Sequence, residues 1–516
     1  MANDSVTAPD ISLKSSSSGS TSLVQPDPRR WLALAVIAVA QLMVVLDATI
    51  VNIALPSAQK ALDISTADRQ WIVTAYTLTF GGLLLLGGRI ADYFGRRRTF
   101  LIGLLGFAGA SALGGAAVNA GTLFAARGLQ GLFGALLAPA ALSLITVTFT
   151  EAKERAQAFG VFGGISGGGA AIGLLAGGVL TEYANWRWCL LVNIPIAILA
   201  FVAALPVVKE SKAQGDTRYD IPGAVLATAG QVALVYGFTK AATDGWASTV
   251  TISWLASAVV LLAAFLVWES RTAHPLLPLR VLFDRDRGAS YIVSILLGAG
   301  MLGMFLFMTF YLQQTLGWSA MKSGVAYMPF SGGIIAAAVV ASRLLPRTGP
   351  KVLMTIGGLL ATASMVWLTR LDLDSSYVTA ILPSFVAMSF GMGLVFVPMS
   401  SLALQGVANH DAGVASAMVN TTQQVGGSLG TALLNTIFTT AVAGYVTDHM
   451  SDAANAGQGG AQLLQAHAAI HGYNVAFTAS AVLLAVATAV VILMVRNNSA
   501  DRATSQSEDH VPVHVG

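Results

Sequence analysis

Cysteine and charge are both scarce in this chain. Cys189 is the single cysteine among 516 residues, so no disulfide can form within the chain and no cysteine-based metal site can exist. Asp, Glu, Lys and Arg together make up only 10% of the residues, whereas a soluble domain carries about 25% because its surface must face water. The sequence therefore excludes a water-soluble protein of this size and predicts that lipid is its solvent.

Features that would indicate other functions are also missing. The net charge of +3 is small and no basic stripe is present, which argues against a nucleic-acid partner. The seven histidines show no ligand spacing, no cluster of His, Asp or Ser lies near a predicted membrane face, and no nucleotide-binding loop occurs. We therefore expect no metal, no cofactor and no enzyme activity, and the protein must draw its energy from ion gradients.

What the chain has instead is long apolar runs, with 55% hydrophobic residues and a mean hydropathy of +0.69. A membrane-spanning helix needs about 20 mostly apolar residues. The sequence predicts an all-α integral membrane protein with fourteen such helices. The predicted spans are residues 31–55, 71–90, 99–118, 122–147, 156–180, 188–207, 221–238, 250–268, 289–312, 324–341, 352–368, 377–404, 414–440 and 475–495.

The distribution of basic residues predicts the orientation. If both termini are cytoplasmic and the spans alternate, the inner segments hold 21 Lys and Arg, the outer loops hold six, and Arg127 lies within a span. A bias of this size is typical of cytoplasmic loops, so we expect a multi-pass protein of the cell inner (plasma) membrane with both termini inside. The polar ends, 1–28 and 497–516, are predicted to be disordered cytoplasmic tails, and 445–472 is predicted to be the longest outer loop.

Two short inner loops resemble one another at an offset of 254 residues. Residues 88–97 and 342–351 share a small residue, an arginine, a glycine and a terminal cation, and each loop joins the second and third helix of a six-helix block. This repeat predicts an N-terminal six-helix bundle (29–208), two inserted helices with their loops (209–287) and a C-terminal six-helix bundle (288–496). Transporters built from such repeats bind substrate at mid-membrane, between the halves. Coincidence between two basic hairpins is the alternative.

Four stretches carry motifs: 46–56 in the first span, 88–98 in the loop after the second, 127–131 in the fourth, and the glycines of the fifth span, Gly169, Gly173, Gly177 and Gly178. Together they resemble the major facilitator superfamily, and within it the fourteen-helix drug–proton antiporters. The resemblance covers nearly all of residues 30–496 and implies a major-facilitator fold and drug efflux by alternating access. One residue departs from the antiporter motif: Leu174 stands where proline follows the central glycine. The glycines still allow a neighbouring helix backbone to approach closely.

Asp47 and Arg127 are the ionisable residues placed deep within the predicted spans. A charge at such depth is costly and is functional by default. At 1.5 Å per residue, Asp47 lies about 24 Å along the first helix and Arg127 about 8 Å into the oppositely directed fourth helix, so the two could meet. We predict that they couple transport to protons; a static ion pair that locks two helices is the alternative. Asn52, Gln130, Gln423 and Gln424 are candidates for a substrate cavity, with interhelical packing as the alternative.

The loop after the second span is predicted to form a cytoplasmic latch. Asp92 ends a helix, where the helix dipole disfavours a carboxylate, so it needs a compensating partner. The family resemblance implies that Asp92 faces the helix that begins near Gly413, and that a loop arginine pairs with an acid after the fourth helix. The alternative is that the basic residues only set orientation. The predicted latch residues are Gly88, Asp92, Gly95, Arg96, Arg97, Glu151 and Glu154.

The sequence thus favours a proton-coupled transporter that exports lipophilic drugs or antibiotics. Its expected partners are protons, the lipid bilayer and a small lipophilic or monocationic substrate, with the monomer as the functional unit. The aromatic and methionine residues of the ninth span, Phe305, Phe307, Met308, Phe310 and Tyr311, suit such ligands, although core packing or lipid contact also explains them. A proton symporter for nutrient or metabolite uptake and a non-transporting membrane receptor remain the competing functions.

Overall fold

A computed structural model describes residues 28–149, 151–212, 220–272, 275, 284–404, 412–455 and 460–496. These residues fold into helices joined by short turns, with no strand among them. Apart from Pro28, the two predicted tails lie outside the described residues. Long apolar helices are suited to a lipid bilayer, because each helix forms its backbone hydrogen bonds within itself.

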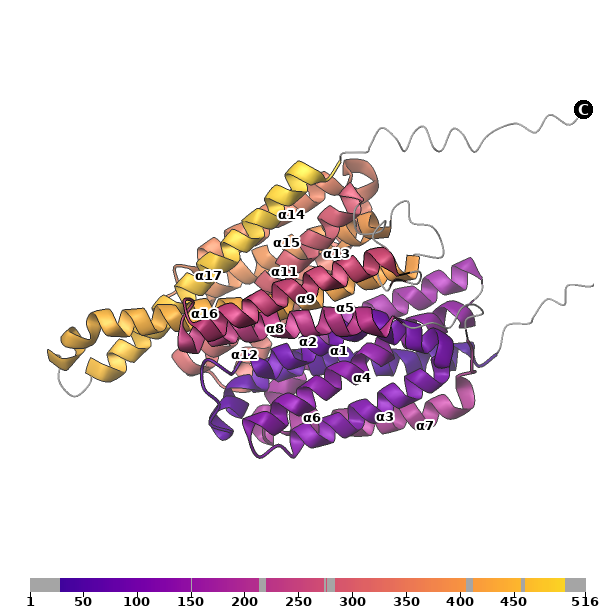
Figure 1. Cartoon of the computed structure of the whole chain (residues 1–516), viewed down its shortest axis with the longest axis horizontal. Helices are drawn as coiled ribbons and strands as arrows, with labels where there is room; N and C mark the ends of the chain where they lie inside the picture. The colour runs from indigo at the N-terminus through magenta and orange to yellow at the C-terminus, as the bar shows by residue number, and fades with distance from the viewer. Residues whose placement is uncertain are drawn as a thin grey trace, which may run out of the picture.

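The N-terminal helices, indigo to magenta in Figure 1, lie together on one side of the molecule. They are α1 (Arg30–Ala61), α2 (Trp71–Phe94), α3 (Arg96–Gly115), α4 (Ala120–Thr148), α5 (Ala152–Tyr183), α6 (Trp188–Leu191) and α7 (Asn193–Val207). A buried apolar cluster from Ala33 to Val208 includes residues of α1–α5 and α7 and holds these six helices together. The predicted sixth span is divided between α6 and α7, which separate at Val192.

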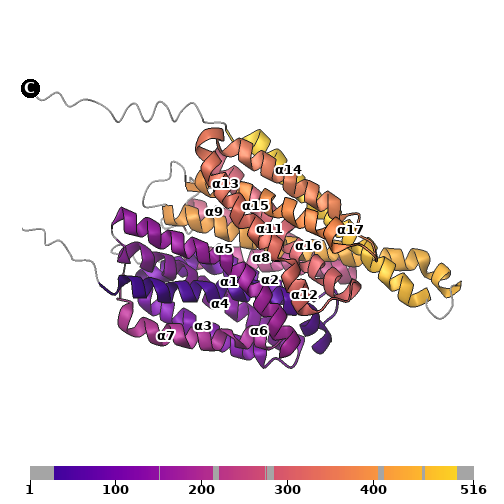
Figure 2. The same cartoon turned by 180° about the vertical axis from the view of Figure 1, so that it is seen from behind.

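The C-terminal helices, red-orange to yellow, lie on the other side (Figures 1 and 2). They are α11 (Arg285–Phe310) with the π-helical turn η1 (Tyr311–Thr315), α12 (Ala320–Ala326), α13 (Met328–Thr348), α14 (Pro350–Leu368), the turn η2 (Tyr377–Ile381) with α15 (Leu382–Leu404), α16 (Ala412–Asn455) and α17 (Gly460–Met494). Between the two groups, α8 (Ile221–Asp244) packs against both α2 and α16, and α9 (Thr249–Arg271) packs on α8.

Twelve of the described helices are long and apolar enough to cross a membrane, and α2 makes thirteen when its two parts, which meet at 54°, are taken as one span. The helix α5 is also of membrane length, with 32 residues, and its segment Ile172–Tyr183 is an apolar helix. The structure is therefore that of a multi-pass helical membrane protein, and the count of fourteen spans stays a prediction.

One predicted loop is in fact mostly helical. Residues 445–472 were expected to form an outer loop, but α16 continues to Asn455 and α17 begins at Gly460. The reason is composition: no proline occurs between 412 and 494, and the segment is rich in alanine, the strongest helix former. The two helices extend beyond the rest of the bundle as the orange and yellow hairpin in Figures 1 and 2.

The two groups of helices meet near one end of the bundle. This end carries residues 62–70, between α1 and α2, and is named here the 61–71 end; the opposite end, with Gly95 between α2 and α3, is the 94–96 end. At the 61–71 end α5 packs against α12, and the Cβ position of Gly178 lies 2.7 Å from the Cα of Met321. The amide of Gln313 also donates a 2.9 Å hydrogen bond to the carbonyl of Ile53.

Candidate functional site: a buried ion pair between the first and fourth helices

Asp47 is fully buried, with 0% of its surface exposed. Its Oδ2 lies 2.7 Å from Nη1 of Arg127. Its Oδ1 accepts hydrogen bonds from the side-chain amides of Gln130 (2.9 Å) and Asn193 (2.8 Å). The expectation that Asp47 and Arg127 meet is confirmed, and the carboxylate is held by three side chains from α4 and α7.

Arg127 is almost as completely buried as Asp47, with 1% of its surface exposed. Its Nη1 also donates to Oε1 of Gln130 (2.7 Å), and its Nε donates to the backbone carbonyl of Ile72 in the first turn of α2 (2.9 Å). The guanidinium carbon lies 4.5 Å from the centre of the Tyr76 ring. These partners compensate the high cost of burying a charge, which exceeds the attraction within a pair unless further hydrogen bonds are made.

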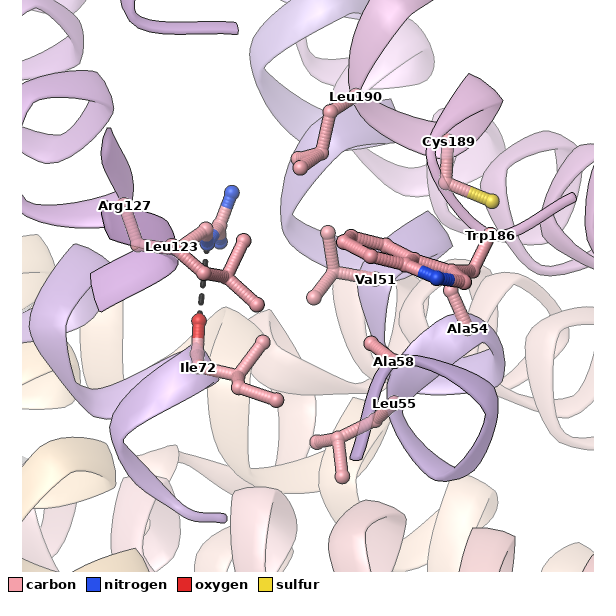
Figure 3. Close-up of a pocket in the computed structure, with 10 residues that line it drawn as sticks. All are labelled: Val51, Ala54, Leu55, Ala58, Ile72, Leu123, Arg127, Trp186, Cys189 and Leu190. Atoms are coloured by element: carbon pink, nitrogen blue, oxygen red, sulfur yellow. Dashed lines mark hydrogen bonds between the residues drawn. The ribbon is translucent and has the colours of Figure 1, made fainter. Parts of the chain in front are cut away.

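A narrow apolar cavity, with room for about one water molecule, runs from Arg127 toward the 61–71 end (Figure 3). In Figure 3, Arg127, Leu123 and Ile72 lie on one side of it, and a dashed line marks the bond from Arg127 to Ile72. Residues of α1 and the aromatic ring of Trp186 lie on the other side. The remaining lining residues are Val51, Ala54, Leu55, Ala58, Cys189 and Leu190.

The predicted latch residues form ion pairs that differ from the expected ones. Arg96 bonds to Asp92 (2.7 Å) within its own turn, and Glu154 bonds to Arg30 at the start of α1 (2.7 Å). The sequence placed an arginine of this loop against Glu151 or Glu154, but Arg30 reaches Glu154 here because α1 and α5 pack side by side. Asp92 was expected to face the start of α16; its ion pair is with Arg96, and residues 405–411 before α16 lie outside the described residues.

Glu210, an acid outside the prediction, bonds the other end of this loop. It accepts hydrogen bonds from the backbone N–H groups of Arg97 and Arg98 at the start of α3, both at 3.2 Å. A carboxylate is favoured there by the helix dipole and by the free N–H groups. Gly95 turns the chain between α2 and α3 with φ of 126°, and a Cβ on it would meet the Glu210 carboxylate. Gly88 lies near Pro139, and Glu151 is exposed at the start of α5.

A comparison with known protein families shows which family has this architecture. Residues 37–431 match the model of the Major Facilitator Superfamily. The chain belongs to this superfamily. It is 49% identical to the puromycin resistance protein pur8 of Streptomyces alboniger, over 93% of this chain and 95% of that protein. It is 36% identical to the tetracenomycin C resistance and export protein of Streptomyces glaucescens, over 82% of this chain and 79% of that one.

Solved structures of transporters share the superfamily fold. A bacterial homolog of the human lysosomal transporter Spinster, in an inward-facing and unoccupied conformation, matches with a TM-score of 0.64 at 15% identity. The match covers 91% of this chain and 97% of that chain. At this identity the likeness shows the fold alone.

In this major facilitator protein the glycines of α5 lie where other helices come closest. The Cβ positions of Gly169 and Gly177 lie within 3.1 Å of α1 atoms, and that of Gly173 meets Thr49. Gly178 faces α12 across the two halves. The α5 helix runs unbroken from Ala152 to Tyr183, so Leu174 introduces no interruption where the antiporter motif has proline.

The remaining candidate cavity residues and aromatic residues lie in packing contacts or at the interface between the two halves. Asn52 is buried and donates to the carbonyl of Ala48 in its own helix. Gln424 is half-buried, and its Cβ lies 2.8 Å from the Cβ position of Gly81, where α16 crosses α2. Gln423 is half-buried too, and its carbonyl lies against Gly298 of α11. The aromatic residues of α11 and η1, Phe305, Phe307, Phe310 and Tyr311, are buried with Met308, so core packing explains them.

Sequence reasoning missed three polar residues around the ion pair. Asn193 bonds to Asp47, Tyr76 lies under Arg127, and Ser111 accepts a 2.8 Å hydrogen bond from Gln130. It also left out Asp220 and Glu269, which are buried at the ends of α8 and α9. Asp220 caps α8 through the N–H of Gly223 and accepts from the indole of Trp268 (2.7 Å). A polar residue within an apolar run was the available signal.

Proposed function

We propose that this major facilitator protein exports a small lipophilic or monocationic antibiotic-like molecule in exchange for protons, by alternating access. The names of its relatives support the substrate class, since they denote resistance to puromycin and resistance to and export of tetracenomycin C. The observation that carries proton coupling is Asp47, a carboxylate withdrawn from water and held by a guanidinium at 2.7 Å. An acid of this kind within a membrane marks an ion or proton pathway.

The proposal includes the orientation and the division of the chain. The bias of basic residues supports cytoplasmic termini in a plasma membrane, which places the 94–96 end inside and the 61–71 end outside. The packing of α1–α7, of α8 with α9, and of α11–α17 supports two six-helix bundles with two inserted helices. The protein acts as a monomer, and Gln423, Gln424, Asn52 and Gln130 contribute to the cavity during the cycle.

The test is transport by the purified protein in liposomes with an imposed pH difference and a panel of lipophilic compounds. We expect pH-driven accumulation by the wild type and its loss in Asp47→Asn, because the amide cannot exchange a proton. Asp63→Asn is the matched control: Asp63 is exposed in the adjacent turn with φ of 50°, a conformation that asparagine also tolerates. Full pH-driven transport by Asp47→Asn would refute the assignment.

The same preparation separates the competing functions. Transport against the substrate gradient when protons flow in the opposite direction identifies an exporter. Substrate that moves with the protons identifies an uptake symporter. Binding without any net flux identifies a receptor.

A further inference from the structure

The 61–71 end is closed by an arginine that reaches from one half into the other. Arg69 precedes α2, yet only 2% of its surface is exposed. Its guanidinium carbon lies 3.9 Å from the ring centre of Phe310 in α11 and 4.8 Å from that of Phe438 in α16. Its Nε donates to Oδ1 of Asn435 (3.2 Å).

Asn435 of α16, in the C-terminal half, also donates hydrogen bonds to the turn before α2. Its amide nitrogen donates to the carbonyls of Thr66 (3.0 Å) and Ala67 (3.3 Å) and to Oε1 of Gln70 (2.5 Å). The amide of Gln70 in turn donates to Thr239 of α8 (3.1 Å). One amide therefore ties together the turn before α2, the helix α16 and, through Gln70, the inserted helix α8.

The closure is finely balanced because the charge of Arg69 is not neutralised. Among the described residues no carboxylate bonds to Arg69, and its Nη2 has no hydrogen-bond partner. Burial lowers the pKa of Arg69 to about 10, so the side chain is still a cation at physiological pH. Burying an unpaired charge is costly, whereas a desolvated cation is attracted to the faces of aromatic rings. A small change in position can therefore decide whether Arg69 stays between the halves.

The turn that holds Arg69 is joined directly to the ion pair. The N–H of Ile72 donates to the carbonyl of Arg69 (3.3 Å), and the N–H groups of Val73 and Thr74 donate to that of Gln70 (3.0 and 2.8 Å). The carbonyl of Ile72 accepts from Arg127, as Figure 3 shows. Only Arg127 and one turn of backbone thus separate Asp47 from the closing residues.

We propose that the charge on Asp47 controls closure of the 61–71 end through Arg127 and the first turn of α2, with Arg69 as the positioning residue that transmits it to the C-terminal half. This inference rests on the proposed function. When Asp47 is ionised, Arg127 is fixed and its Nε holds the carbonyl of Ile72. When Asp47 is neutral, the charge-assisted bond is lost, Arg127 is free to leave Ile72, and the turn no longer holds Arg69 between Phe310 and Phe438.

The groups around both charged residues are few in the part of the chain that the structure describes. Arg127, Tyr76 of α2 and Cys189 of α6 interact electrostatically with Asp47. Tyr473 of α17 is the titratable group that interacts with Arg69. Asp47 is the acid among these groups that is joined to the closure, through Arg127 and the carbonyl of Ile72.

The experiment measures the distance across the 61–71 end by double electron–electron resonance. Spin labels are placed on cysteines introduced at Ala61 and Ser376, which are exposed on opposite halves. The native Cys189 stays in place because it is fully buried. We expect Asp47→Asn to increase the fraction of long distances at least about fivefold, the lower range of a coupling free energy between sites. Lowering the pH should do the same in the wild type. Arg69→Gln and Asn435→Ala should increase this fraction too, and adding Asp47→Asn to either should then change little.

Two variants at the same end serve as matched controls. Arg187 also stacks on an aromatic ring, that of Trp186, and donates to the carbonyl of Gly115, but within the N-terminal half. Asn474 donates to Leu371 within the C-terminal half. Arg187→Gln and Asn474→Ala should leave the distances unchanged.

The proposal is overturned if Asp47→Asn has the same effect in the Arg69→Gln protein as in the wild type, or if the controls act like Arg69→Gln. If transport needs Asp47 but the two effects are additive, only this inference fails. If Asp47→Asn still exchanges protons for substrate, the proposed function fails as well.

Discussion

The carboxylate of Asp47 in α1 is the point at which contacts from α4 and α7 meet. Three donors from two helices converge on its two oxygens. Hydrogen bonds to a charged group contribute about 1.5–3 kcal/mol each. A proton on Asp47 therefore weakens the hydrogen bonds that Arg127, Gln130 and Asn193 donate to it, so protonation at one atom alters the contacts of α1, α4 and α7 together.

Asp92 provides a test of the loop at the 94–96 end. Its pairing with Arg96 is half-exposed and lies within one turn, and such pairs contribute only about 0–1 kcal/mol to stability. We predict that Asp92→Asn lowers transport in liposomes to about a tenth of wild type or less, a change of about 1.4 kcal/mol or more, with normal expression and thermal unfolding. Normal transport would show that the loop serves orientation alone.

At this scale the sequence could indicate the ion pair but not its surroundings. Asp47 and Arg127 stand out because charges are rare in long apolar runs, and helix rise places them at similar depth. Asn193 could not be singled out, because many amides in membrane helices bond across helices for packing. The partner of Glu154 was also beyond prediction, since Arg30 and Glu154 are 124 residues apart and meet only when α1 and α5 pack.

Among the helices, the contact between α5 and α12 depends on the absence of a side chain at Gly178. A Cβ there would lie 2.7 Å from the Cα of Met321 and 3.0 Å from the carbonyl of Ala320. Backbone atoms cannot move aside as a flexible side chain can, and overpacking costs about 1–3 kcal/mol. We predict that Gly178→Val shifts the Ala61–Ser376 distances toward the open form and slows transport.

Gly109→Val is the control for that prediction. Gly109 lies on the exposed face of α3, and nothing lies within 4 Å of its Cβ position. Unchanged distances in both variants would show that the halves separate without breaking the contact at Gly178.

The helices themselves were largely predictable, because long apolar runs and the requirement for internal hydrogen bonding leave few alternatives. Their ends and breaks were less so. The hairpin of α16 and α17 extends beyond the predicted spans because hydropathy marks the lipid boundary and not the end of a helix. The separation of α6 from α7 at Val192 has a signal in Pro195, which has no N–H to bond to the carbonyl of Leu191, but the apolar run that continues across it hides the break.

Over the whole molecule, Arg127 of the ion pair lies toward the closed 61–71 end, where it bonds to Ile72 in the first turn of α2. A large buried apolar cluster there includes residues of α1, α2 and the C-terminal helices. The fold could be expected from an internal repeat, but not which end is closed, because that depends on contacts between residues far apart, such as Arg69 and Asn435. The structure thus represents a state in which this end is closed and Asp47 contacts Arg127.

The number of deep carboxylates also sets the energetics of transport. Among the described residues three acids are buried, but Asp220 and Glu269 lie at helix ends, and only Asp47 lies well within a span. We therefore predict one proton per cycle, so that export of a neutral substrate moves one net charge. A charge that crosses 100 mV contributes about 2.3 kcal/mol, which corresponds to a roughly 50-fold concentration ratio. Liposomes at equal pH on both sides, with a potassium diffusion potential of this size, should accumulate a neutral substrate to that extent. The Asp47→Asn protein should show no response to voltage. A wild type that is driven by a pH difference but indifferent to voltage would show that a compensating charge also moves in each cycle, and the single-carboxylate mechanism would be wrong.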